Sequence, residues 1–426
     1  MANTTGYIRR LRPMEEAFTI SNDAMPLCVV CVLHLTTRPE VAAVRLALEQ
    51  LQSRFPLLRA QIGRKSGNFY FEELHPVPPI SLVVVERSQD ETWLSEASGL
   101  VNTTFDRSGP LMKCTFVRSS SEMDCELLVT FHHAIMDSKS ARLILHEFLT
   151  RTSGDVPATS ISPDYGSTLK PSPGLRSYLL FSRRQLVEGV RYLRRGFYAP
   201  IPKKSENALL SLRLSPTVSR ALQVNIGRKG HSLNSVLLAA ITLALIRNYP
   251  VKKAKQLARV LSFVDLRPYY SPAVPDAELG CYISMLRLSV AARSDQPIWA
   301  LASAIRGALM QALRNQEIQI MAKLSKRLVG MALKGKNMRL GISALSFMGK
   351  LELDRHYGSI ELRDVSTYIT NNRFGPQFSA FGKILHGSIG LDFTYLPAEM
   401  SATHAAQLVQ EVRQTLEEIS KPEASF

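Results

Sequence analysis

The sequence predicts an α+β protein built from two domains of similar size. The chain is 426 residues long, and apolar runs of strand length alternate with amphipathic helices in both of its halves. A segment rich in Ser, Thr, Pro and Gly separates the halves. A single hydrophobic core rarely serves a chain of this length, and two domains of roughly 150–200 residues suit it better. Hydrophobic residues form 45% of the chain and charged residues 21%, which excludes a disordered protein.

The first half contains one clear helix and four strand candidates. Thr37 and Glu40 fit a capping box, with Pro39 in the first turn. The apolar positions that follow are three and four apart, which predicts the core-facing stripe of a helix: Val41, Val44, Leu48, Leu51 and Phe55. The strand candidates are residues 27–35, 80–85, 111–117 and 127–131.

Residues 150–175 lack periodicity and have the composition of a linker. A basic helix follows, and the second half then repeats the mixed pattern. Helices are predicted over 233–249, capped by Ser232, over 402–419, and on the apolar stripe from Ile298 to Leu313. Strands are predicted over 257–264 and 388–396.

The net charge of +16 implies an acidic partner, which could be nucleic acid, a membrane surface or a phosphorylated carrier. Nine Lys or Arg residues and a single acid, Glu188, lie between positions 170 and 204. Six arginines recur there at helical spacing: Arg176, Arg183, Arg184, Arg191, Arg194 and Arg195. A second basic cluster contains Lys323, Lys326, Arg327, Lys334, Lys336 and Arg339. Both clusters are open to two interpretations, a solvated helix face or a docking surface.

The cysteines do not indicate a metal site. Cys28 and Cys31 have the spacing of half a zinc site, but no second pair completes it, and a strand would turn their thiols to opposite faces. We expect no metal and a reducing, cytoplasmic location. The first residues lack an apolar signal core, and the most apolar run, 235–246, is shorter than the roughly 20 residues of a membrane span. We therefore expect neither secretion nor a transmembrane segment.

The stretch LLVTFHHAIMDSKSARLILHEFL, residues 127–149, is the strongest functional signal. Alternate residues of a strand share a face, so the adjacent His132 and His133 point to opposite sides. Asp137 and Ser138 are both suitable N-caps for the helix that follows. His133 thus lies at a strand end beside a helix N-terminus, a favourable place for a general base. The spacing alone also fits a satisfied core histidine and an aspartate that only caps a helix.

HHAIMDS resembles the HHxxxDG motif of the superfamily that includes chloramphenicol acetyltransferases, condensation domains, plant alcohol acyltransferases and polyketide-associated acyltransferases. Further stretches resemble this superfamily's motifs in the same order: RLRPMEEAF (10–18), SRFPLLRAQI (53–62), GHSLNSVLLAAI (230–241), VDLRP (264–268) and ELGCYISML (278–286). LDFTYLPAEMS (391–401) replaces the plant DFGWG motif, which makes the pattern most similar to polyketide-associated and microbial alcohol O-acyltransferases. Ser138 replaces the motif's glycine, and Phe347 stands where relatives often carry asparagine.

The resemblance implies an α+β fold of two chloramphenicol-acetyltransferase-like halves with the active site in a tunnel between them. It implies an N-terminal half over residues 1–165 that carries the motif, a basic crossover helix over 166–205, and a C-terminal half over 206–426.

The resemblance also assigns roles to single residues. His133 is expected to be the general base, which takes a proton from the acceptor and delivers it to the leaving thiolate. Asp137 is expected to be structural, orienting the motif through an arginine: Arg267 or, as the weaker candidate, Arg59. His132 is expected to support the base. Ser346 is a candidate for polarising the carbonyl oxygen, although a plain strand or turn role is the stronger interpretation.

The expected reaction moves an acyl group from acyl-CoA or a phosphopantetheine-linked acyl thioester to a small-molecule alcohol, in secondary-metabolite or lipid biosynthesis, without a bound cofactor. The expected partner of this monomer is an acidic acyl carrier protein or polyketide synthase carrier domain, docked on Arg183, Arg184, Arg191, Arg194 and Arg195. Amide formation by a stand-alone condensation enzyme and an inactive carrier-docking scaffold are the alternatives. Nucleic-acid binding would account only for the net charge, and the sequence contains no recognisable nucleic-acid-binding module.

Overall fold

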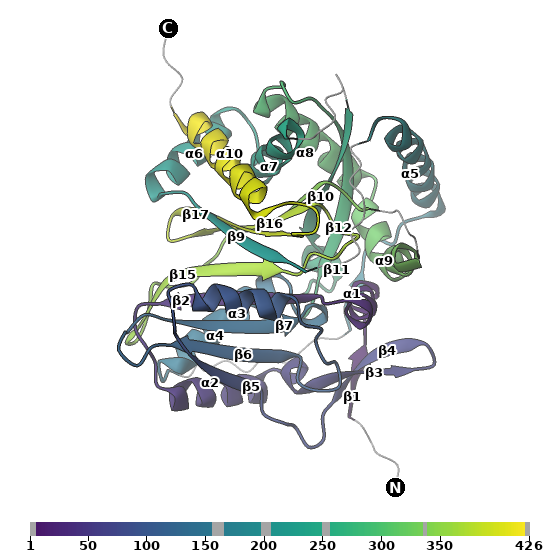
Figure 1. Ribbon diagram of the computed structural model, residues 1–426. Coiled ribbons are helices and arrows are strands. Elements are labelled where there is room, and N and C mark those ends of the chain that lie inside the picture. The colour runs from purple at the N-terminus through teal and green to yellow at the C-terminus, as the bar shows by residue number, and fades with distance from the viewer. Residues whose placement is uncertain (1–5, 156–165, 197–205, 249–255, 335–338, 422–426) are drawn as a thin grey trace.

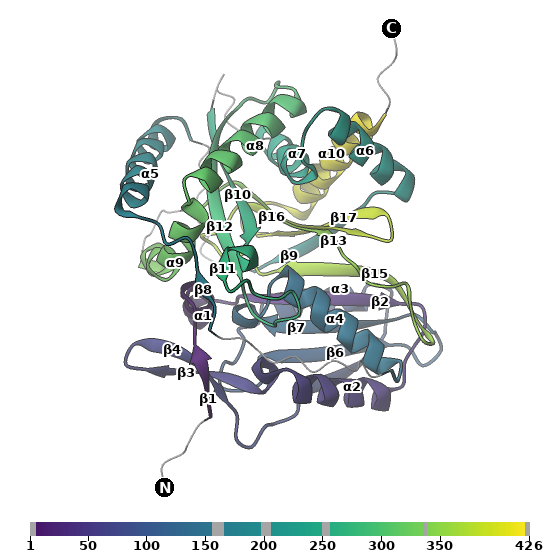
Figure 2. The same ribbon diagram turned by 180° about the vertical axis from the view of Figure 1, so that it is seen from behind.

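The computed structural model describes residues 6–155, 166–196, 206–248, 256–334 and 339–421. They form two lobes, and each lobe is organised around one six-stranded sheet (Figures 1 and 2). The amino-terminal lobe occupies the lower part of Figure 1 and the carboxy-terminal lobe the upper part. Both lobes mix strands with helices, so the predicted α+β class is confirmed.

The first sheet belongs to the amino-terminal lobe. In spatial order its strands are β14 (His356–Tyr357), β15 (Ile360–Ile369), β2 (Cys28–Leu35), β7 (Cys125–His132), β6 (Met112–Arg118) and β5 (Ser81–Glu86). Its helices are α2 (Val41–Arg54), α3 (Thr92–Val101) and α4 (Ser138–Thr152). Cys31 packs in the core beneath α2 and α4, whereas Cys28 packs with α3 on the other face. The two thiols therefore lie on opposite faces of β2, as the odd spacing predicted.

Helix α2 starts differently from the prediction. Its N-cap is Glu40, and no side chain caps the helix, so the capping box assigned to Thr37 is wrong. The backbone N–H of Thr36 donates to the carbonyl of Glu361, and the Thr36 hydroxyl donates to the Glu361 carboxylate. The chain before the helix is thus held by strand contacts, and local sequence spacing could not reveal them.

The second sheet belongs to the carboxy-terminal lobe. In spatial order its strands are β12 (Ile283–Ala292), β10 (Gln256–Asp265), β13 (Ser343–Lys350), β16 (Phe378–Leu385), β17 (Ser388–Tyr395) and β9 (Ala208–Arg213). Its helices are α6 (Pro216–Arg228), α7 (Leu233–Arg247), α8 (Ile298–Arg314) and α10 (Ala402–Ser420). They share one large hydrophobic core with the sheet. Ser232 caps α7 by accepting a bond from the Ser235 N–H, as predicted.

Strand β15 crosses between the lobes. It follows the second-lobe strand β13 in sequence, yet it pairs antiparallel with β2 of the first sheet, Val365 opposite Leu33. Asp392 of β17 accepts bonds from the Thr367 N–H of β15 and from the buried Lys383 of β16, at 2.9 and 2.6 Å. Consequently residues 360–369, which the sequence assigned to the second half, complete the sheet of the first.

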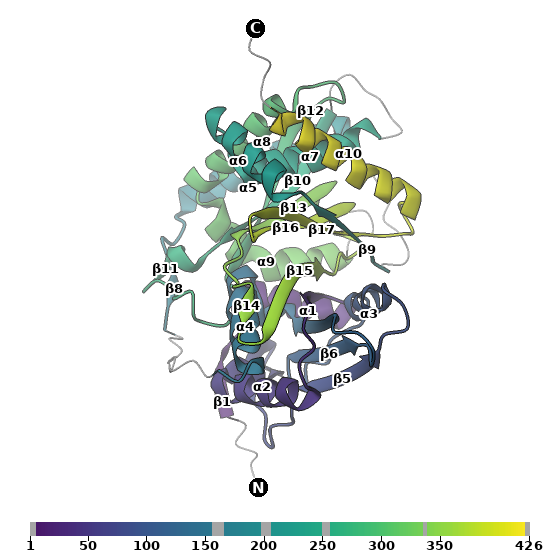
Figure 3. The ribbon, with the colours of Figure 1, turned by 90° about the vertical axis from the view of Figure 1, so that its left-hand side faces the viewer.

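Among the remaining elements, α1 and α9 lie near the junction of the lobes (Figure 3). The short sheets contain β1 (Gly6–Arg10), β4 (Asn68–Glu73) and β3 (Ala60–Lys65), and β11 (Tyr270–Ser271) with β8 (Thr168–Leu169). The other helices are α1 (Pro13–Ala24), α5 (Leu175–Arg195) and α9 (Glu317–Lys334), with 3₁₀ turns η1 (Pro56–Arg59), η2 (His133–Ile135) and η3 (Arg267–Tyr269). Helix α1 packs against both η2 and α9, which joins the first lobe to the second.

No single helix in the described ranges is long and apolar enough to cross a membrane. Helices α6 and α7 meet the length and composition criteria only when they are counted together, and they meet at an angle of 105°.

Candidate active site

The two histidines lie where β7 turns into α4. His132 is the last residue of β7, and His133 begins the turn η2. The Ala134 N–H donates to Nδ1 of His132 at 3.1 Å, and the Ser140 N–H donates to Oδ1 of Asp137 at 2.9 Å. Asp137, rather than Ser138, is therefore the N-cap of α4. These two local bonds define the sharp turn that carries His133.

The imidazole of His133 is held in one orientation. Its Nδ1 lies 3.0 Å from the carbonyl oxygen of Met136. A carbonyl can only accept, so Nδ1 carries the proton and Nε2 carries the free electron pair. The ring of Phe18 stacks on it with centroids 4.1 Å apart. Burial lowers the pKa of His133 below its usual value, which keeps the ring neutral near pH 7.

His132 occupies a different environment. It is fully buried, whereas His133 retains 6% exposure. Burial lowers the pKa of His132 to about 3, and the ring meets Phe105 edge-on. Among the described residues, Nε2 of His132 has no hydrogen-bond partner. The two histidines therefore differ in exposure, and His133 is the more accessible of the two.

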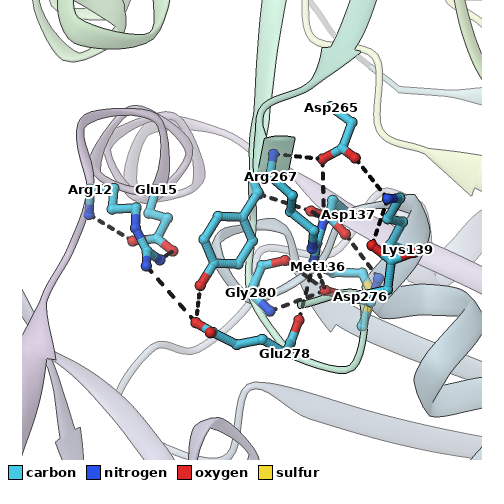
Figure 4. A network of polar contacts seen from close by, with 12 residues as sticks. Arg12, Glu15, Met136, Asp137, Lys139, Asp265, Arg267, Asp276, Glu278 and Gly280 are labelled. Carbon is cyan, nitrogen blue, oxygen red and sulfur yellow. Dashed lines mark hydrogen bonds and ion pairs between the residues drawn. The ribbon is translucent and has the colours of Figure 1, made fainter. Parts of the chain in front are cut away.

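Asp137 forms a buried ion pair with Arg267 across the two lobes (Figure 4). Nη1 of Arg267 donates to Oδ2 of Asp137, and the Tyr282 N–H donates to the same oxygen at 2.8 Å. The side chains are only 2% and 1% exposed. The carboxylate thus points away from His133 and binds η3 and the residue just before β12, both in the second lobe, to the start of α4. Arg59, the weaker candidate for this partner, instead pairs with Glu73.

Sequence reasoning missed a polar network around this ion pair. Nη2 of Arg267 donates to the Ser140 hydroxyl at 3.0 Å, and that hydroxyl donates to the Gly280 carbonyl at 2.7 Å. The Tyr282 hydroxyl donates to Glu278, and Arg12 of the first lobe lies over the Tyr282 ring at 4.2 Å. Apart from Ser140, these residues fall within the segments that carry the resemblance, but their mutual contacts are tertiary.

A second, more exposed link lies beside the first. Lys139 contacts Asp265 and Asp276 at 3.0 and 2.6 Å, and all three side chains are partly exposed. Both links connect the amino-terminal end of α4 to the segment that joins β10 to β12 (Figure 4). The turn that presents His133 is therefore fastened to the opposite lobe at two places.

The other predicted site residues lie elsewhere. Ser346 is on β13 opposite Phe381, and within the described ranges no hydrogen bond joins it to His133. Arg183, Arg191 and Arg194 are exposed on α5, at the periphery of the second lobe. Arg184 differs from them because it binds Glu188 and Glu317 at 2.7 and 2.5 Å. The side chain of Arg195 and residue Lys336 lie outside the described part of the chain.

The described residues contain no group of three His, Cys, Asp or Glu side chains placed to hold a metal ion. The unprotonated Nε2 of His133 can accept a proton.

Solved structures with the same architecture cover nearly the whole chain. The trichothecene 15-O-acetyltransferase TRI3 from Fusarium sporotrichioides has a TM-score of 0.76 and 11% identity over 96% of this chain and 94% of that one. Polyketide synthase associated protein 5 from Mycobacterium tuberculosis has a TM-score of 0.68 and 19% identity over 99% of both chains. The first condensation domain of the calcium-dependent antibiotic synthetase has a TM-score of 0.67 and 16% identity over 98% of both. The chain therefore has the two-lobed fold of condensation domains and chloramphenicol-acetyltransferase-like acyltransferases.

These likenesses confirm the two-lobed fold that the motifs predicted. Residues 204–381, less than half of the chain, also match the family described as phthiocerol/phthiodiolone dimycocerosyl transferase C-terminus. No curated protein sequence matches the chain significantly. The comparisons thus show the fold and a partial match to an acyltransferase family, and they identify neither a donor nor an acceptor.

Proposed function

We propose that the protein is an O-acyltransferase that moves an acyl group from a thioester to an alcohol, with His133 as the general base. The observation that carries the proposal is the orientation of His133. Its Nδ1 faces the Met136 carbonyl, its pKa is lowered, and Nε2 keeps a free electron pair at the junction of the two lobes. A neutral imidazole held in one tautomer suits proton transfer near neutral pH.

The proposed reaction needs one base and no acyl-enzyme. The acceptor hydroxyl attacks the carbonyl carbon of the thioester while its proton moves to Nε2 of His133. The carbon–sulfur bond then breaks, and the leaving thiolate takes the proton back from Nε2. The products are an ester and a free thiol, and His133 returns to its starting state. Binding donor and acceptor together supplies the entropic part of catalysis.

Two features would prepare the base for this reaction. Phe18 covers one face of the ring, so the substrates approach Nε2 along the edge that the stack leaves open. The pair of Asp137 with Arg267 keeps the carboxylate turned away from the imidazole and holds the turn to the second lobe. Asp137 is therefore proposed as a positioning residue rather than a proton acceptor.

Mass spectrometry of reaction products tests the proposal. Acyl groups of several lengths would be offered on coenzyme A and on a phosphopantetheine-bearing carrier protein, together with an alcohol and an amine of matched skeleton. We expect ester formation from the alcohol with at least one donor class, and ester formation slower by about 10²–10⁴-fold from the His133→Ala variant. Exclusive amide formation would instead favour the stand-alone condensation enzyme. If no donor supports transfer to either acceptor, the scaffold interpretation would replace catalysis.

The lowered pKa of His133 predicts the shape of the pH profile. The neutral imidazole is the active form, and burial lowers its pKa below the ordinary value of about 6.5. Activity should therefore stay constant as the pH falls from 8 through 6.5 and should decline only at lower pH. The measurement is kcat/KM against pH, with the melting temperature followed at each pH. An acid limb centred at or above pH 6.5 would contradict the burial argument.

A further inference from the structure

Helix α5 is oriented with its polar side toward the protein. Glu188 on this side binds Arg184 and accepts from the Ser289 hydroxyl of β12 at 2.8 Å. The Ser177 hydroxyl donates to Gln316 at 3.2 Å, and Tyr192 is buried beneath Arg259. A surface helix ordinarily turns its apolar stripe inward. In α5 the hydrogen bonds and ion pairs share the inward side with the buried rings of Phe181 and Tyr192.

The outward side of α5 carries an uncovered row of aliphatic side chains. Leu175, Leu186 and Leu193 are 76%, 70% and 74% exposed, and Leu179 and Val190 are exposed as well. At 100° per residue these five positions fall within an arc of about 60°. Along the helix the row extends about 27 Å at the usual rise per residue. Leu180 and Val187, also exposed, widen the apolar surface.

Arginines lie directly beside this aliphatic row. Arg183, Arg176 and Arg194 come next around the helix, at about 80–100° from Leu175, and Arg191 follows at about 160°. All four are exposed. The single acid of the helix, Glu188, faces the protein. The outward side therefore combines hydrocarbon with positive charge and has no compensating carboxylate.

The neighbouring helix α9 contacts α5 and adds further positive charge. Lys323, Arg327 and Lys334 are exposed on it, and Lys323 also bonds to Ser172 just before α5. Met331 of α9 is 60% exposed. Figures 1 and 2 show α5 and α9 together at one margin of the second lobe.

We infer that the outward side of α5 binds the surface of an anionic lipid bilayer, with the leucines inserted among the acyl chains and the arginines bound to the headgroup phosphates. A helix that lies in a membrane interface has this combination of an apolar stripe and flanking cations. The inference rests on α5 alone and holds whether or not the proposed acyl transfer occurs.

An acidic carrier protein fits the outward side of α5 less well than an anionic bilayer does. An acidic carrier explains the arginines, but a charged, hydrated partner surface would leave the long row of leucines facing polar groups. Arg184, one of the arginines assigned to carrier docking, is already bound to Glu188 and Glu317 within the protein. An anionic bilayer provides both hydrocarbon for the row and phosphate for the arginines.

Co-sedimentation of the full chain with lipid vesicles tests this inference. One set of vesicles would contain phosphatidylcholine alone, and the other phosphatidylcholine with an equal amount of phosphatidylglycerol. We expect binding to the mixed vesicles that exceeds binding to neutral ones by on the order of 100-fold and weakens with salt. Absence of binding to the mixed vesicles at low salt would overturn the inference.

Two sets of variants separate the hydrocarbon and charge contributions. Leu179→Gln/Leu186→Gln/Leu193→Gln should lower partitioning to both kinds of vesicle by about 100-fold, since each leucine loses its insertion into the bilayer. Arg183→Gln/Arg191→Gln/Arg194→Gln should lower binding to the anionic vesicles by on the order of 100-fold and leave binding to the neutral ones unchanged. Melting curves should remain close to wild type because all six side chains are exposed.

Control variants remove exposed arginines and exposed apolar side chains from other helices. Arg220→Gln/Arg228→Gln/Arg314→Gln takes three exposed arginines from α6 and α8, and Val224→Gln/Met310→Gln takes exposed apolar side chains from the same helices. Both controls should bind vesicles as the wild type does. If the charge control lost as much binding as the α5 arginine variant, net charge rather than α5 would be responsible. Loss of carrier-protein binding or of self-association in the leucine variant, with vesicle binding unchanged, would assign the surface to a protein partner instead.

Discussion

Replacing His133 with alanine should lower kcat by about 10²–10⁴-fold, the usual contribution of a positioned general base, while the protein remains folded. Nε2 of His133 is the group proposed to move the proton, and alanine removes it together with the bond to Met136. The measurement is product formation under substrate saturation, accompanied by a melting curve. Added free imidazole should restore part of the lost turnover, since it supplies the missing base.

The adjacent histidine provides the control for this experiment. His132 accepts a bond from the Ala134 N–H through Nδ1, and the amide oxygen of His132→Asn can accept the same bond. We expect His132→Asn to retain most of the wild-type turnover. If His133→Ala turned over substrate at nearly the wild-type rate, or if both variants lost activity equally, His133 would not be the base.

Breaking the ion pair between Asp137 and Arg267 should destabilise the protein by about 3–5 kcal/mol, because either change leaves one charge buried without its partner. Arg267→Met and Asp137→Asn would be compared with the double variant by urea unfolding. The double variant should be less destabilised than the sum of the single changes, since neither charge then remains. Activity should fall with stability, because the same pair fixes the turn that holds His133.

Lys139 offers a matched control at the same end of α4. Its contacts with Asp265 and Asp276 also join the lobes, but all three side chains are partly exposed. We expect Lys139→Met to cost at most about 1 kcal/mol of unfolding free energy. Equal losses from Arg267→Met and Lys139→Met would mean that burial of the Asp137 pair contributes little.

The sequence was sufficient to predict those parts of the site that depend on contacts between residues close together in the chain. The turn after β7 depends on the short-range bonds of His132 and Asp137, and the spacing of these residues is visible in a few consecutive positions. Arg267 was found through the resemblance, as part of a second motif. Phe18 lay inside a quoted motif but received no role, because its stacking on His133 is a tertiary contact.

The errors in the fold prediction have the same origin. The capping box at Thr37 was wrong because strand contacts hold the preceding residue Thr36. The periodicity of α5 predicted an amphipathic helix and an arginine face, but periodicity cannot say which side of a helix faces the protein. Arg184 consequently belonged to the inner contacts rather than to the exposed set. The pairing of β15 with β2 of the first sheet was not predicted, because pairing between strands that are distant in sequence leaves no local signal.

The pairing of β15 with β2 has a consequence for how the chain folds during its synthesis on the ribosome. β2 ends at Leu35, but the strand that covers its edge begins only at Ile360. At typical elongation rates the interval between their synthesis is roughly 15–65 seconds. During that time the apolar edge of β2 is a template for pairing with other chains. The amino-terminal lobe cannot finish folding as an autonomous unit during translation, so nascent chains should depend on chaperones until β15 arrives.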